Sequence, residues 1–316
     1  MWRRSQVWLG LLVSVLALAL AARGVAWDTV WEALAGAGYV WLIPAAIAVV
    51  LAVWARGERW CWLFGERRSR LPRSRYYGAS AIGYLVTNSL PLRVGEVARV
   101  FFITRGRQQS YGVAASTIVL EHVLDLLVVL GMLLRIVLLG AVPLPGWARQ
   151  GAAVAGVLLG GALAVIVLML DGFAVLRPGL PLAMVLLWSV VSWLASAVTY
   201  HLALQAFVPG APFTYALFAT TVTTFVLMVP ATPGGVGTVQ LGIQRALAVF
   251  GVPAAVGLGF SIVSHVMGIM VMDLLGVVFL LREAGSWAKA REALRAVTAQ
   301  VAAGQDAAPA VPGGST

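Results

Sequence analysis

The sequence contains a single cysteine and few charged residues. Only one of its 316 residues is a cysteine, Cys61, which excludes an intrachain disulfide and a cysteine-based metal site. Charged residues make up 11% of the chain and hydrophobic residues 61%, with a mean hydropathy of +0.93. A soluble domain could not carry that composition on its surface. The sequence therefore predicts an all-α protein that crosses the membrane several times.

The motifs of common enzymes are missing as well. The sequence has no H-E-x-x-H pair, no G-x-S-x-G nucleophile turn and no Walker phosphate loop. We therefore expect no cofactor and no bound metal, and we favour a transporter over an enzyme. The formal net charge of +10 lies almost entirely in arginine-rich loops and the C-terminal tail. In those places it indicates membrane topology rather than nucleic-acid binding.

Six apolar segments reach, or nearly reach, the length of about 20 residues that a helix needs to cross a bilayer. They cover residues 7–22, 39–55, 113–139, 152–170, 182–207 and 255–281. The first segment could instead be a cleaved signal peptide, but Arg3 and Arg4 before it equally suit an uncleaved helix, which we favour. Between the first two segments, residues 27–35 have the spacing of an amphipathic helix at the membrane surface.

Seven arginines crowd the segment that follows the second predicted span, so this loop is expected to be cytoplasmic. They are Arg56, Arg59, Arg67, Arg68, Arg70, Arg73 and Arg75. Both termini then fall on the cytoplasmic side. We expect one membrane domain, residues 1–284, and a tail, residues 285–316, that begins basic and ends disordered.

One short sequence motif occurs twice in the chain. Residues 91–97 and 233–239 share the pattern P-x-x-V-G-x-V, and each copy interrupts a long apolar stretch. The distribution of arginines favours two stretches, 76–104 and 213–252, that each enter the membrane and return, from opposite faces. The prediction is a pair of re-entrant helical hairpins in an inverted-repeat arrangement.

The repeat would divide the membrane domain into halves at about 1–139 and 150–284. Beyond the phrase itself the flanking identity is poor, and only His122-Val123 and His265-Val266 add an echo. The alternative is that Pro233 links two complete helices and that the match is chance.

Four acidic residues fall within apolar segments, where an ionisable group is costly and a functional role is the default interpretation. They are Glu96, Glu121, Asp125 and Asp273. Glu121 and Asp125 are four apart and share one helix face, so they could accept hydrogen bonds from Arg93 or Arg99. The alternative is a purely structural clamp that holds the first hairpin.

Polar groups follow each of the two breaks. Arg93, Glu96 and Arg99 would line one side of a short helix, where the arginines could hold a phosphate or simply extend to the lipid headgroups. After the second break, glycine backbone N–H groups could bind an anion. These glycines are Gly234, Gly235 and Gly237, and Gln240 follows them on the same helix.

Histidine is the remaining candidate for proton chemistry. The three histidines could carry protons, with Asp273 as an acceptor: His122, His201 and His265. A single histidine within a membrane is more often a hydrogen-bonded contact between helices, which we favour here.

Three stretches in fixed order resemble the lysylphosphatidylglycerol synthase transmembrane family, also called flippase-like membrane proteins. They run from Asn88 to Arg99, from Glu121 to Asp125 and from Val229 to Gly237, and the resemblance extends over about residues 7–281. It implies a bacterial inner-membrane protein related to the membrane half of the multiple peptide resistance factors, which translocate aminoacylated phosphatidylglycerol. Other relatives are associated with glycolipid or hopanoid metabolism.

The sequence departs from the family pattern in two ways. It ends at Thr316 without the soluble aminoacyl-transferase domain, so synthesis of a lysyl-lipid is not expected. Gln240 stands where the family usually has an acidic residue, which argues against a proton or cation role at that position.

We predict from these features a lipid translocase in which two opposed hairpins meet near the midplane. The substrate would be an anionic phospholipid or a lipid-linked headgroup, and membrane lipids are the expected partners. Its path would be lined by Asn88, Arg93, Glu96, Arg99, Glu121, Asp125, Gly234, Gly235, Gly237 and Gln240. The alternatives are an intramembrane enzyme that acts on phospholipids or lipid-linked sugars, and a non-catalytic partner of a lipid-modifying enzyme.

Overall fold

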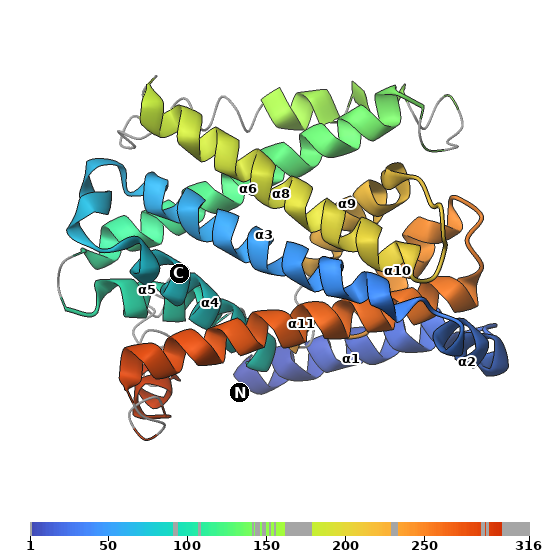
Figure 1. The fold of residues 1–316 in the computed structure, drawn as a ribbon, viewed down its shortest axis with the longest axis horizontal. Coiled ribbons are helices and arrows are strands. Elements are labelled where there is room, and N and C mark those ends of the chain that lie inside the picture. The colour runs from blue at the N-terminus through green and yellow to red at the C-terminus, as the bar shows by residue number, and fades with distance from the viewer. Residues whose placement is uncertain are drawn as a thin grey trace, which may run out of the picture.

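A computed structural model of the chain describes most of the predicted membrane domain. The described residues are 2–90, 94–106, 109–140, 142, 146, 150, 151, 153, 154, 156–161, 179–228, 233–285, 288 and 291–298. Within these residues the secondary structure is helical and contains no strand, which confirms the predicted all-α class (Figure 1).

Four long helices have the length and composition of membrane spans. They are Tyr39–Leu63, formed by the short helix η1 (Tyr39–Trp41) and α3 (Leu42–Leu63), and α6 (Tyr111–Leu138), α8 (Leu180–Gln205) and α11 (Ala254–Ala284). The chain is thus a multi-pass membrane protein. The predicted span 152–170 lies largely outside the described residues.

The first predicted span and the predicted surface helix form a bent pair. Helix α1 (Trp2–Ala22) is followed by α2 (Trp27–Ala35), and their axes differ by 85°. If this pair counts as one span, the described residues contain five. The buried side chains Ala21 and Val30 of the two helices pack against α11, which fixes the bend.

Helix α3 continues beyond the predicted end of the second span. We expected a loop from residue 56 onward, but the helix runs to Leu63 and includes both Arg56 and Arg59. The prediction that these two arginines lie in the loop is therefore wrong. The arginine-rich connection begins only at η2 (Gly65–Arg70). The apolar residues Trp60 to Leu63 extend the buried face of the helix past the charges, which explains the longer span.

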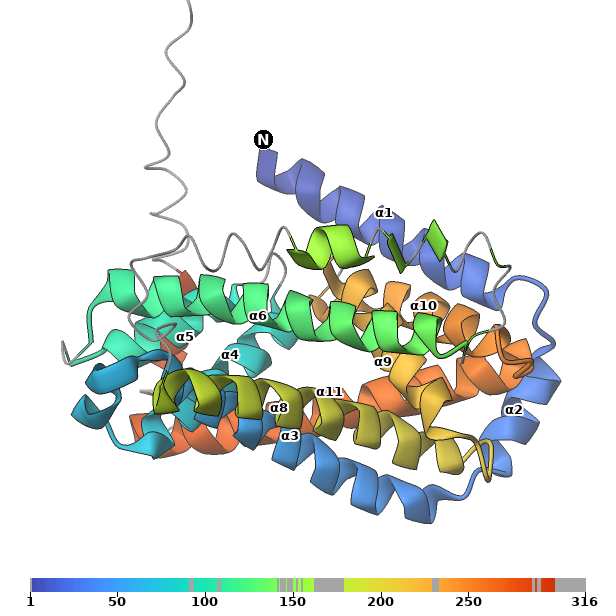
Figure 2. The same ribbon diagram turned by 90° about the horizontal axis from the view of Figure 1, so that it is seen from above.

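Two pairs of shorter helices, which we call the first and the second hairpin, pack against the long helices. The first consists of α4 (Arg73–Ser89) and α5 (Gly95–Thr104), and the second of α9 (Phe213–Met228), the short turn η4 (Pro233–Gly235) and α10 (Thr238–Ala248). Figures 1 and 2 show α4 and α5 towards one end of the long helices and α9 and α10 towards the other.

Small residues bring the helices of each hairpin close together. A methyl group on Gly95 would lie 2.0 Å from the Gly83 carbonyl oxygen, so α5 crosses α4 almost backbone to backbone. In the second hairpin, a methyl group on Gly242 would lie 2.8 Å from Cγ2 of Val226. Such close crossings are how helices associate in a membrane, where apolar contact alone gives little preference for protein over lipid.

The start of the predicted tail packs onto the membrane domain. Residues 291–298 are helical, and Ala293 and Val297 are buried in the same apolar cluster as Trp60 and Phe64. The tail therefore begins as an integral part of the fold. The predicted disorder concerns residues 299–316, which lie outside the described residues.

Candidate functional site

Four charged side chains meet in the interior, at the contact of three helices. Arg59 of α3, Arg99 of α5, and Glu121 and Asp125 of α6 form what we call the buried ion cluster. Arg59 Nη2 donates to Glu121 Oε1 at 2.8 Å and to Asp125 Oδ2 at 3.0 Å, and Arg99 Nη2 donates to Glu121 Oε2 at 2.7 Å. The predicted pairing of Glu121 with Arg99 is thus confirmed.

Arg59 is the member of the cluster that the sequence did not reveal. Its side chain is 0% exposed and also donates through Nη1 to Asp125 Oδ1. Its position immediately before the apolar run from Trp60 to Leu63 was the available signal. Two arginines and two carboxylates give the cluster no formal net charge, which is the condition under which such groups tolerate burial.

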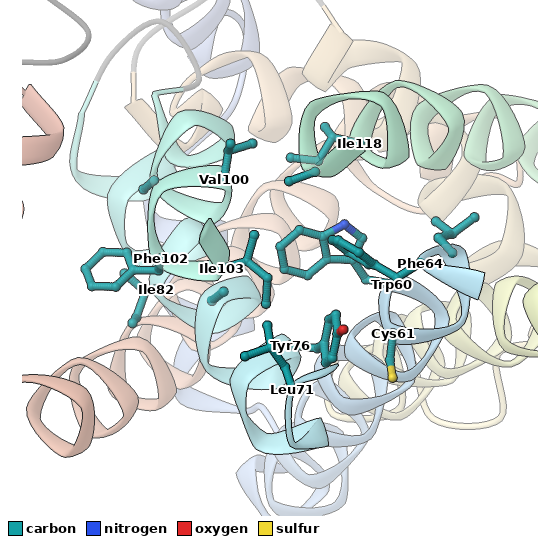
Figure 3. Close-up of a cluster of buried hydrophobic side chains, with 14 of the residues drawn as sticks. Trp60, Cys61, Phe64, Leu71, Tyr76, Ile82, Val100, Phe102, Ile103 and Ile118 are labelled. Atoms are coloured by element: carbon teal, nitrogen blue, oxygen red, sulfur yellow. The ribbon is translucent and has the colours of Figure 1, made fainter. Parts of the chain in front are cut away.

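Aromatic side chains enclose the buried ion cluster. The Arg99 guanidinium lies over the Trp60 ring at 4.3 Å from its centroid, and Trp60 Nε1 donates to Thr117 at 3.0 Å. Figure 3 shows Trp60 between Tyr76 and Ile118, with its nitrogen turned towards Ile118. On the far side, Trp193 Nε1 donates to Asp125 Oδ1 at 2.7 Å. This enclosure fixes α3, α5, α6 and α8 relative to one another.

The geometry of the cluster has the features of the predicted clamp. Arg99 is held by Glu121 through both of its terminal nitrogens, at 2.7 and 3.4 Å. The Nε–H groups of Arg59 and Arg99 are buried and donate to no described residue. Arg93, the other predicted phosphate ligand, lies outside the described residues. The structure therefore brings Arg99, Glu121 and Asp125 together, but around Arg59.

A second ionisable contact joins α5 to α6 at a more accessible place. His122 Nε2 lies 2.9 Å from Glu96 Oε1, and His122 Nδ1 lies 2.8 Å from the carbonyl oxygen of Ile118. The two side chains are 41% and 34% exposed, in contrast to the buried ion cluster one residue away at Glu121. No local pattern in the sequence indicates this pairing, because only the packing of α5 against α6 brings the residues together.

The glycine-rich turn of the second hairpin is defined by an unusual backbone conformation. Gly234, Gly235 and Gly237 have φ angles of 66°, 70° and 89°, which other residues adopt only with strain. The N–H group of Gly237, which we predicted to be open to an anion, donates to Gln240 Oε1 at 2.6 Å. Gln240 Nε2 lies 2.9 Å from His265 Nδ1 of α11.

Both hairpins reach the same face of α11. Gln240 contacts His265, Gly234 lies against Ile269, and Asn88 at the end of α4 donates to Asp273 at 2.8 Å. These three residues of α11 are four apart and therefore line one side of the helix. Ile269 is the central residue of the 31-residue helix α11. The ends of the two hairpins thus meet at the middle of a helix that has the length of a membrane span.

Asp273 has a different partner from the one expected, since Asn88 rather than a histidine donates to it. His201, the third predicted proton carrier, lies near Gln205 and near Phe213, the first residue of α9. It contacts neither Asp273 nor the glycine-rich turn in the described hydrogen bonds. No group of three or more His, Cys, Asp and Glu side chains that could hold a metal ion occurs among the described residues. We call the groups at the hairpin ends the midplane seam; they are Asn88, Asp273, Gly234, Gln240 and His265.

A comparison with known proteins assigns most of the chain to one family. The family model described as lysylphosphatidylglycerol synthase TM region matches residues 7–276, which include both hairpins and the buried ion cluster. No curated protein and no solved structure gives a significant match to the chain.

Proposed function

We propose a function on the premise that the chain belongs to the lysylphosphatidylglycerol synthase TM region family. We propose that the protein is a membrane lipid translocase, which moves a phospholipid or a lipid-linked headgroup from one leaflet to the other. The headgroup travels along the midplane seam while the acyl chains stay in the surrounding lipid. The two hairpins are re-entrant and enter from opposite faces, and the halves form an inverted repeat.

The observation that carries this proposal is the meeting of both hairpin ends at the centre of α11. Polar groups at membrane depth are expensive and mark the path of a polar substrate in most transporters. Here Asn88, Asp273, Gln240 and His265 are hydrogen-bonded to one another in pairs between two interrupted helices. Interrupted helices that face each other near the midplane are the usual site of transport.

The buried ion cluster serves this function as a lock on the first hairpin. A phosphate oxygen can reach Arg99 only after α5 has moved, because the Arg99 side chain is 7% exposed and is bound to Glu121. An arginine released in this way presents the bidentate geometry that phosphate prefers. The clamp and the headgroup site are then two states of the same residues.

Lipid movement in vesicles tests the proposal directly. Purified protein is reconstituted into unilamellar vesicles that contain fluorescent phosphatidylglycerol, phosphatidylethanolamine or phosphatidylcholine, and an impermeant quencher is added outside. The expected result is quenching beyond the outer-leaflet fraction, faster than in protein-free vesicles. A panel in which no lipid moves faster than in those vesicles would overturn the proposal. Chemical conversion of a lipid by protein in detergent would instead support an intramembrane enzyme.

A reversible crosslink tests whether the seam must open. In a Cys61→Ser background, Asn88→Cys and Asp273→Cys place two thiols across the seam, and a short cleavable bis-thiol reagent joins them. We expect lipid movement to stop on crosslinking and to return on reduction. The two single-cysteine variants are the matched controls, since the reagent modifies them without joining the helices. Unchanged movement in the crosslinked protein would show that lipids do not pass at this seam.

A further inference from the structure

Each hairpin places one polar side chain against a histidine of the long helix that follows it. In the first half Glu96 of α5 faces His122 of α6, and in the second half Gln240 of α10 faces His265 of α11. Both contacts join a hairpin helix to the long helix that follows it, but the two histidine rings carry different numbers of protons. That number follows from which partner atoms can donate and which can only accept.

In the second half, the hydrogen bond between Gln240 and His265 requires a neutral His265 ring. Gln240 Oε1 accepts from the backbone N–H of Gly237, so the nitrogen of the same amide faces His265 Nδ1 as a donor. His265 Nδ1 must then be unprotonated and accept this hydrogen bond. Protonation of Nδ1 would place two donors against each other. This contact therefore favours the neutral histidine.

In the first half both ring nitrogens of His122 face acceptors. The carbonyl oxygen of Ile118 at 2.8 Å can only accept, so Nδ1 carries a proton, and the Glu96 carboxylate at 2.9 Å requires a second proton between it and Nε2. A carboxylic acid is a stronger acid than an imidazolium by about two pKa units, which places this proton on the ring. The pair is an imidazolium and a carboxylate.

We propose that Glu96 and His122 form a proton-binding site that couples proton movement to the opening of the first hairpin. When the ring loses its second proton, one of its nitrogens faces an acceptor with no hydrogen between them. The contact between α5 and α6 then weakens, which frees α5 to move. The contact is intact at low pH and is lost as the pH rises through the titration of the ring.

The surroundings of the pair allow this exchange. The two side chains are 41% and 34% exposed, whereas Arg59 and Glu121 of the buried ion cluster are 0% and 4% exposed. The charged residues of α3 are Arg56, Glu58 and Arg59, and those of α5 are Glu96 and Arg99. Besides His122, α6 contains Glu121, Asp125 and Arg135, and Glu121 is bound to both Arg59 and Arg99. Helices α8 and α9, which also pack on α6, contain no Asp, Glu, Lys or Arg within their bounds. Their titratable residues are Tyr200, His201 and Tyr215.

Ring nitrogen NMR tests the proton site without reference to transport. The chain has only three histidines, so selective ¹⁵N-histidine labelling gives three ring systems, assigned with His201→Gln and His265→Gln. Near neutral pH we expect two protonated nitrogens in His122 and an unprotonated Nδ1 in His265. In Glu96→Gln the amide can donate to His122 Nε2, and the ring should become neutral. An identical His122 spectrum in wild type and Glu96→Gln would overturn the proposal.

Lipid movement at different pH values tests the coupling, which rests on the proposed function. The wild-type rate should rise with pH by up to about tenfold per pH unit across the titration of the ring, and Glu96→Gln should lose this dependence. The matched control is Asp28→Asn, which removes an exposed acid from α2 and should keep the wild-type profile.

The two proposals fail in different ways. If His122 loses its second proton in Glu96→Gln but no lipid moves under any condition, the translocase proposal is wrong and the proton site stands. If lipid moves with the same pH profile in wild type and Glu96→Gln, the coupling is wrong and the translocase stands.

Discussion

The first hairpin is held to the following helix by charges, and the second by glycine packing and neutral hydrogen bonds. Helix α5 contributes Glu96 and Arg99 to ionic contacts with α6. In the second hairpin, Gly234 packs against Ile269 of α11, and Gln240 of α10 contacts His265 of α11. A contact between ionised groups responds to protons and anions, whereas close backbone packing does not. The two hairpins therefore differ in the charge of their contacts. The first hairpin is held by ionised groups, which respond to protons and anions, and the second by neutral groups and close backbone packing.

The largest effect should come from breaking the charges that hold the first hairpin. Arg59→Ala leaves two carboxylates with one fewer counter-charge in the interior, which should lower the free energy of unfolding by about 3–5 kcal/mol. The measurement is denaturant unfolding of the purified protein. Arg56→Ala is the matched control on the same helix, where a half-buried arginine donates to Ser196 at 2.9 Å and should cost about 1 kcal/mol. Equal losses would show that the cluster does not stabilise the fold.

A smaller loss should follow from disturbing the glycine packing of the second hairpin. Gly237→Ala introduces a methyl group 2.3 Å from the Ser14 carbonyl oxygen at a φ of 89°, so α1 must shift. The unfolding free energy should fall by on the order of 2 kcal/mol. Gly251→Ala has a similar φ of 80° but open space around it, and should show only the backbone cost of roughly 1 kcal/mol. Equal effects in the two variants would mean that α1 does not depend on this contact.

The smallest change should make the second hairpin resemble the first. Gln240→Glu replaces the amide donor with a carboxylate beside His265, which should draw a proton onto Nδ1 and make this contact depend on pH. The expected shift in stability with pH is on the order of 1 kcal/mol, and ¹⁵N-histidine NMR gives the protonation state. Gln244→Ala is the control, because Gln244 donates to the carbonyl oxygens of Ala21 and Ala254 and not to a histidine, so His265 should keep its wild-type protonation state. A neutral His265 in Gln240→Glu would contradict the assigned bonding.

Local spacing allowed part of the site to be predicted from the sequence. Glu121 and Asp125 share a face because they are four apart on one helix, and Arg99 is one of the two partners, with Arg93, that the sequence predicts for them. The two breaks were found in the same way, as proline and glycine within apolar runs. Each of these inferences needs only a few neighbouring residues.

The missed contacts depend on packing between helices. Arg59 was counted as a loop charge, since the charge rule treats arginines near a span as topology signals, yet α3 buries it against α6. The pairs Glu96 with His122 and Asn88 with Asp273 join residues 26 and 185 positions apart. Their meeting follows from how the hairpins pack, which no local pattern specifies.

The placement of three seam contacts on one face of α11 has a mechanical consequence. His265, Ile269 and Asp273 point the same way, so a rotation of α11 about its own axis would separate all three from their partners at once. A rotation of α11 is therefore one movement that would release both hairpin ends together.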